Sequence, residues 1–179
     1  LLLGHSMGGL IAVHHLLRHR QIYAAAAVSG PAILPAAPPS RVTIWISRLL
    51  SRLAPRLGVI ALDENGVSRD PAVVAAYRAD PLVYNGKIGA RLAEAMFDAM
   101  AEAAAGASRI TTPLFVQHGD ADALAAPAGG QHLHDHAGSA DKKLIRYPGL
   151  FHEIYNEPEQ AAVLDDLVAW FDAHLPAKA

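Results

Sequence analysis

The pattern Gly4-His5-Ser6-Met7-Gly8 constrains the fold of this chain more than any other feature. It follows three leucines that are typical of a buried strand end, and it precedes a segment to about His19 with apolar residues at helical spacing. A strand, a tight turn and a helix in this order favour a strained turn that lifts a serine side chain above a sheet. We expect the glycines to be required there, because larger side chains would clash with the adjacent strand and helix.

Further apolar runs alternate with helical segments along the rest of the chain. Strands are predicted at 23–29, 113–117 and 143–147, and helices at 127–136 and 158–174. The stretch from about 41 to 108 shows no convincing strand pair and is expected to be mostly helical. This order predicts an α/β fold, a parallel sheet flanked by helices, with core segments at 1–33 and 109–179 and a helical cap or lid insert at 34–108.

Composition excludes several classes of function. The 179 residues are 52% hydrophobic and carry a net charge of −2, which fits a compact domain and argues against nucleic acid as a partner. The sequence contains no cysteine, so disulfides and thiolate chemistry are excluded. It also lacks an uninterrupted apolar run of about 18 residues, the length that suggests a membrane span.

A serine nucleophile needs a histidine base and a carboxylate, and the later loops offer both. In a sheet of this kind the order along the chain is serine, acid, histidine, each at the carboxyl end of a strand. Asp120 and Asp122 follow the strand at 113–117, and His152 follows the strand at 143–147. The backbone N–H of Met7 would face a developing oxyanion. His5 is too close to Ser6 to act as the base, and we expect its ring to pack in the turn, away from the nucleophile.

Four blocks of sequence carry a family resemblance: GHSMGG, SRDPAVVAAYRADPLVYNGKI, PLFVQHGDADALAAP and YPGLFHEIYNEPE. They resemble the monoacylglycerol lipase and lysophospholipase family of α/β-hydrolases, which is related to the S33 serine aminopeptidases. The resemblance implies Ser6 as nucleophile, Asp122 as acid and His152 as base, with Asp120 as the second candidate for the acid. It implies no cofactor. No metal site is predicted, since the histidine pairs His15/His19 and His132/His136 lack a zinc-binding pattern.

The resemblance also implies that a part is missing. Members of this family carry several strands before the serine turn, together with a His-Gly loop that supplies the second oxyanion donor. This chain begins at the turn, so we expect a truncated α/β-hydrolase, poorly soluble or inactive by itself. A non-catalytic remnant is the competing hypothesis.

The insert bears on the substrate. Trp45, Leu49 and Leu50 fall on one apolar helical face with Val42, Ile46 and Leu53, flanked by Arg41, Arg48 and Arg52. This face could pack over the core as a plain cap, or it could be a lid that contacts the acyl chain or a lipid interface. The methionines and phenylalanine between 91 and 106 are expected to pack, with contact to the substrate as the less favoured alternative.

These observations predict a serine ester hydrolase that cleaves a monoacylglycerol, or a similar monoacyl lipid, through an acyl-enzyme on Ser6. A lysophospholipase, a general carboxylesterase and, less favoured, an aminopeptidase of the same fold are the alternatives. The predicted partners are the lipid ester and a transient membrane contact through the cap, with no nucleic acid. The favoured location is cytoplasmic or membrane-associated. Acyl-chain preference and oligomeric state are not predicted.

Overall fold

A parallel sheet of four strands forms the centre of the molecule. The computed structural model describes residues 1–19, 22–35 and 40–175; the side chains of 41–43, and with them the sequence interpretation of Arg41 and Val42, lie outside the described part. The sheet order is β1-β2-β5-β6, with bounds Leu2–His5, Ala26–Ser29, Leu114–Gly119 and Lys142–Tyr147. All three pairings are parallel, which confirms the predicted sheet. The carboxyl ends of the four strands therefore lie at the same edge of the sheet.

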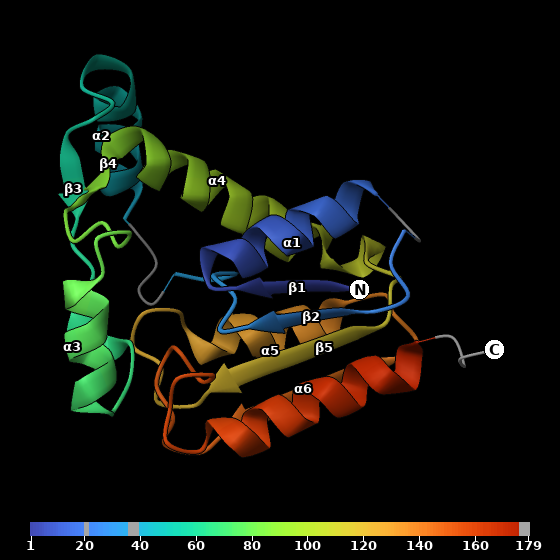
Figure 1. The fold of residues 1–179 in the computed structure, drawn as a ribbon. Coiled ribbons are helices and arrows are strands. Elements are labelled where there is room, and N and C mark those ends of the chain that lie inside the picture. The colour runs from blue at the N-terminus through green and yellow to red at the C-terminus, as the bar shows by residue number, and fades with distance from the viewer. Residues whose placement is uncertain (20–21, 36–39, 176–179) are drawn as a thin grey trace.

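Helices cover both faces of this sheet (Figure 1). One face packs against α1 (Met7–Arg18), α5 (Pro127–His136) and the second half of α4 (Ala90–Gly106), and the other face packs against α6 (Gln160–His174). β2 and the residue before it show how the sequence contributes to both layers: Ala26 and Val28 join the first core cluster, whereas Ala25 and Ala27 join the second. Because successive side chains of a strand alternate, a strand covered on both sides is mostly apolar.

The insert forms a separate group of elements beside the carboxyl edge of the sheet. It contains α2 (Arg41–Leu53), β3 (Gly58–Ile60), the 3-10 turn Glu64–Gly66, α3 (Pro71–Ala79), β4 (Ile88–Gly89) and the start of α4; a second 3-10 turn, Ala107–Arg109, follows α4. Figure 1 shows these elements as a column, from which α4 reaches back over the core. Among the described residues, no helix has the length and apolar character needed to cross a membrane.

The expectation of no strand pair in the insert was wrong. β3 and β4 form a small antiparallel sheet that joins Gly58 to Gly89 and Ile60 to Ile88. Strands of three and two residues are too short to show an alternating pattern, so only the tertiary structure pairs them.

Candidate active site

The turn at Ser6 has the strained geometry that the sequence predicts. Ser6 has φ 53°, a backbone conformation rare outside glycine, and its N–H donates to the carbonyl of Ser29 at 2.9 Å. A Cβ added at Gly4 would lie 2.5 Å from the carbonyl oxygen of Gly8, so glycine is required there. At Gly8, by contrast, an added Cβ would meet no atom within 4 Å, and the expected clash is absent.

Met7 is the first residue of α1. Its N–H is among those that a helix does not use internally, so it stays a candidate donor to an oxyanion beside Ser6.

Asp122 lies directly against His152. Its Oδ2 accepts from Nδ1 of His152 at 2.7 Å, and its Oδ1 accepts from the N–H groups of Leu124 at 2.8 Å and Ala125 at 2.9 Å. Both Asp122 and His152 are buried. Burial alone would raise the pKa of Asp122, but hydrogen bonds from His118 and His152 outweigh it and hold that pKa well below its usual range.

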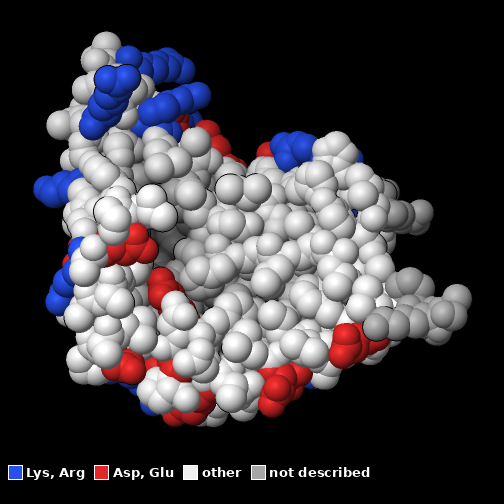
Figure 2. All heavy atoms as spheres, viewed as in Figure 1, with Lys and Arg blue, Asp and Glu red and all other residues white. Residues whose placement is uncertain are grey.

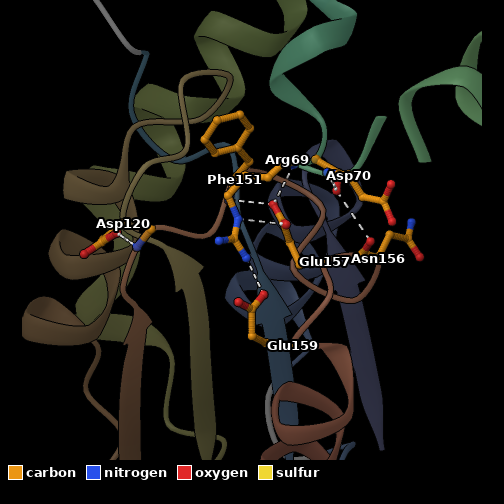
Figure 3. A network of polar contacts seen from close by, with 9 residues as sticks. Arg69, Asp70, Asp120, Phe151, Asn156, Glu157 and Glu159 are labelled. Atoms are coloured by element: carbon orange, nitrogen blue, oxygen red, sulfur yellow. Dashed lines mark hydrogen bonds and ion pairs between the residues drawn. The ribbon is translucent and has the colours of Figure 1, made fainter. Parts of the chain in front are cut away.

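Asp120, the second candidate for the acid, faces elsewhere. Its carboxylate accepts from the N–H of Gly149 at 2.5 Å (Figure 3). The geometry therefore favours Asp122 as the partner of His152.

His5 does not turn away from the nucleophile as expected. Its ring centroid lies 4.8 Å from that of His152, its Nδ1 lies 3.2 Å from Oγ of Ser29, and it lines the same cavity as Ser6. Burial, reinforced by the neighbouring His152, lowers the pKa of His5 to about 4. A neutral imidazole therefore stands beside the site at pH 7.

A cavity of about 390 Å³ joins Ser6 to His152. One wall of the cavity comes from the core segments, and the other comes from the insert and is mostly apolar. The lining residues include Leu62, Val67, Tyr77, Ile88, Leu92, Met96, Met100, Leu124, His152 and Glu153. Met96 and Met100, for which packing is the favoured expectation from the sequence, line this cavity. Their helical spacing alone could not separate a cavity wall from a core contact.

The predicted substrate residues of α2 lie elsewhere. Trp45, Leu49 and Leu50 are not among the described residues that line this cavity. The exposed fractions of Trp45 and Leu53 are 66% and 74%, and Ile46 and Leu49 are exposed as well, whereas Ser51 is buried. The apolar face of α2 is therefore turned to solvent, and its role in substrate binding stays a prediction.

A buried carboxylate joins the insert to the loop that carries His152 (Figure 3). Glu157 is fully buried; its Oε1 accepts from the N–H of Phe151 at 2.9 Å and of Arg69 at 3.1 Å, and its Oε2 accepts from Nε of Arg69 at 3.0 Å. Two backbone bonds run beside it, from His152 to Gly66 and from Glu153 to Val67. The histidine loop is therefore fastened to the base of the insert.

His118 is the site residue that sequence reasoning missed. It lies at the end of β5, fully buried, with its Nε2 3.1 Å from Oδ2 of Asp122. The pattern His118-Gly119-Asp120-Ala121-Asp122 contains the signal, because it places a histidine at the end of the strand, four residues before Asp122. In the described residues, no group of three or more His, Asp or Glu side chains is arranged to hold a metal ion.

Comparison with known proteins identifies the family. The family model described as serine aminopeptidase, S33, matches residues 1–159. The chain belongs to this family. This S33 member is 45% identical over 175 residues to a monoacylglycerol lipase of Mycolicibacterium smegmatis, an alignment that covers 98% of the chain and 62% of that relative. It is 29% identical to the mouse monoglyceride lipase, covering 98% of the chain and 59% of the relative. The S33 chain thus spans less than two thirds of these curated relatives.

Solved structures agree with the fold of the S33 chain. A monoacylglycerol lipase from Paleococcus ferrophilus matches with a TM-score of 0.89 and 28% identity, covering 97% of this chain and 68% of that one. A soluble variant of the Saccharomyces cerevisiae monoglyceride lipase, in complex with a substrate analogue, matches with a TM-score of 0.83 and 26% identity, covering 98% and 62%. The α/β-hydrolase fold expected from the sequence is confirmed.

Proposed function

We propose that the natural protein carrying this chain is a serine ester hydrolase that cleaves monoacylglycerols. The observation that carries the proposal is the bond of 2.7 Å between His152 and Asp122 at a cavity shared with Ser6. The similarity to monoacylglycerol lipases over nearly the whole chain supports this substrate class.

In the proposed reaction, Oγ of Ser6 attacks the ester carbonyl while Nε2 of His152 takes the hydroxyl proton. Asp122 stabilises the resulting imidazolium through Nδ1. The C–O bond to glycerol then breaks, and the leaving oxygen takes the proton back from His152. Water, deprotonated by His152, attacks the acyl-enzyme, and Ser6 is released with its proton restored. The N–H of Met7 donates to the oxyanion in both tetrahedral intermediates.

The cavity lining supports a substrate that is apolar at one part and polar at another. Leu92, Met96 and Met100 offer an apolar wall to an acyl chain, whereas Tyr77 and Glu153 offer polar atoms to hydroxyl groups. Long, flexible methionine side chains adapt to acyl chains of varied shape.

Contact with a lipid interface is a further part of the proposal. The exposed face of α2 combines Trp45, Leu49 and Leu53 with the exposed arginines Arg48 and Arg52. Figure 2 shows basic side chains gathered at this end of the insert. An amphipathic helix with a basic edge suits a membrane surface with anionic lipids.

Active-site labelling with a fluorophosphonate and hydrolysis assays test the function. The natural protein should take one adduct, and Ser6→Ala should take none and lose hydrolysis by about 10³-fold or more. A monoacylglycerol should be cleaved faster than a lysophospholipid, a short-chain ester or an aminoacyl anilide. Preference for the anilide would make the protein an aminopeptidase, and absence of any adduct on the natural protein would overturn the serine-hydrolase proposal.

A further inference from the structure

His118 is a buried titratable group to which the proposed reaction assigns no part. Its ring is fully buried at the end of β5. Nε2 lies 3.1 Å from Oδ2 of Asp122 and 3.1 Å from the carbonyl oxygen of Ala125. Both neighbours are hydrogen-bond acceptors, so Nε2 must carry a proton.

The other ring nitrogen of His118 defines the tautomer. In the described part of the chain, Nδ1 is the buried side-chain nitrogen that has no hydrogen-bond partner. Helix α5 closes over it so tightly that a Cβ at Gly130 would lie 2.7 Å from Nδ1. A proton on Nδ1 would be a buried donor without an acceptor, which is unfavourable. The geometry therefore selects the neutral imidazole with its proton on Nε2.

This tautomer completes the set of donors around Asp122. Oδ2 receives N–H groups from His152 at 2.7 Å and from His118 at 3.1 Å, while Oδ1 receives two backbone N–H groups. Three of these four donors belong to β5 and the loop that follows it, and His152 is the one donor from another loop. The titratable groups facing this carboxylate are His118, His152 and, farther off, His5.

We propose that His118 is a positioning residue of the triad: its neutral imidazole donates to Oδ2 of Asp122 and holds the carboxylate in the orientation that His152 needs. The proposal deepens the proposed hydrolase function and rests on it. A neutral donor orients the acid without cancelling its charge, so Asp122 keeps its full attraction for the imidazolium that forms during catalysis. An imidazolium at this place would weaken that attraction.

Three substitutions in the natural protein test this role. His118→Leu removes the donor, His118→Gln places an amide N–H close to the position of Nε2, and His118→Asn places one near Nδ1 instead. Leu and Asn should each lower kcat about 10–100-fold with little change in KM, as expected for a misplaced catalytic group. Gln should restore most of kcat. In His118→Leu the acid limb of kcat/KM should move to higher pH, because Oδ2 then bonds to His152 alone and favours the protonated base.

His132→Leu is the matched control, because His132 also bonds a carbonyl through Nε2, that of Ala104 at 3.1 Å, but lies away from the site. It should lower the melting temperature without moving kcat or the acid limb. The positioning role is wrong if His118→Leu keeps kcat within about twofold of the parent. It is also wrong if His118→Asn has as high a kcat as His118→Gln.

A spectroscopic measurement separates this proposal from the hydrolase assignment. Histidine ¹H–¹⁵N spectra of the natural protein at pH 7, with His118 assigned from its variants, should show a protonated Nε2 and a bare Nδ1. A protonated Nδ1 would overturn the donor role whatever the activity. The bare Nδ1 in a protein that takes no fluorophosphonate adduct would instead refute the hydrolase function and, with it, the catalytic purpose of the donor.

Discussion

At the scale of single residues, the two glycines of the serine turn differ, because backbone atoms crowd Gly4 and leave Gly8 free. Gly4 sits where an added Cβ would be 2.5 Å from the carbonyl oxygen of Gly8, and backbone atoms cannot yield without moving α1. Gly8 lies in α1 with no atom within 4 Å of its added Cβ. A close backbone contact therefore requires glycine at position 4, whereas no such contact requires it at position 8.

This contrast predicts opposite effects of two alanine substitutions. Gly4→Ala should lower the unfolding free energy by about 1–3 kcal/mol, as overpacking does. Gly8→Ala should leave it unchanged or raise it by up to about 1 kcal/mol, because alanine favours the helix.

Denaturant unfolding of the natural protein and both variants checks this pair. Equal destabilisation by the two substitutions would contradict this explanation, because only the Cβ of Gly4→Ala would clash with the carbonyl oxygen of Gly8.

At the scale of elements, the insert and the histidine loop form one unit through Glu157. The fully buried carboxylate bonds Phe151, the neighbour of His152, on one side and Arg69 on the other. Arg69 also pairs with Glu159, which is half exposed. The two glutamates share a cation, but only one of them lies in the interior.

Glu157→Gln should therefore be far more damaging than Glu159→Gln. The first should lower the unfolding free energy by about 2–3 kcal/mol, because two backbone N–H groups and the guanidinium lose a buried charged acceptor. It should also lower kcat, since Phe151 precedes His152. The second should change stability little, as expected for an exposed ion pair.

Thermal unfolding and hydrolysis measured on both variants provide the comparison. A stable but slow Glu157→Gln protein would still support a link between the insert and His152, whereas two variants with full kcat would contradict it.

At the scale of the whole molecule, the insert presents a basic, apolar end away from the sheet. Trp45 is 66% exposed there, while the second tryptophan, Trp170, is 8% exposed in the core. Intrinsic fluorescence can therefore report the environment of Trp45.

Vesicles should reveal the proposed membrane contact. Phosphatidylcholine vesicles containing phosphatidylglycerol should bind the natural protein and shift the emission of Trp45 to shorter wavelength. Arg48→Gln and Arg52→Gln should each weaken binding about fivefold, from about 1 kcal/mol per basic residue near an anionic surface. The double variant Trp45→Ser/Leu53→Ser should also bind these vesicles weakly.

Leu82→Ser is the control, because Leu82 is 92% exposed but lies outside α2. If this substitution weakens vesicle binding as much as the pair in α2, the contact does not involve that helix.

The sequence by itself determined the parallel sheet, the serine turn and the order along the chain of the candidate residues Ser6, Asp122 and His152. These are local patterns: an apolar run, a glycine spacing, and loops that follow strands, which parallel pairing brings to one edge. Patterns of this kind can be read from the order of residues alone. In the structure, Ser6 and His152 line one cavity, and Asp122 bonds to His152.

Only the tertiary structure placed Asp122, and not Asp120, against His152, turned His5 toward His152, and set His118 against Asp122. It also paired β3 with β4 and turned the apolar face of α2 outward. Each of these depends on contacts between segments far apart in the chain, or on a side-chain direction set by the close approach of a helix. Hydrophobic periodicity records that a face is apolar, but whether that face meets the core, a cavity or solvent depends on what the rest of the chain packs against it.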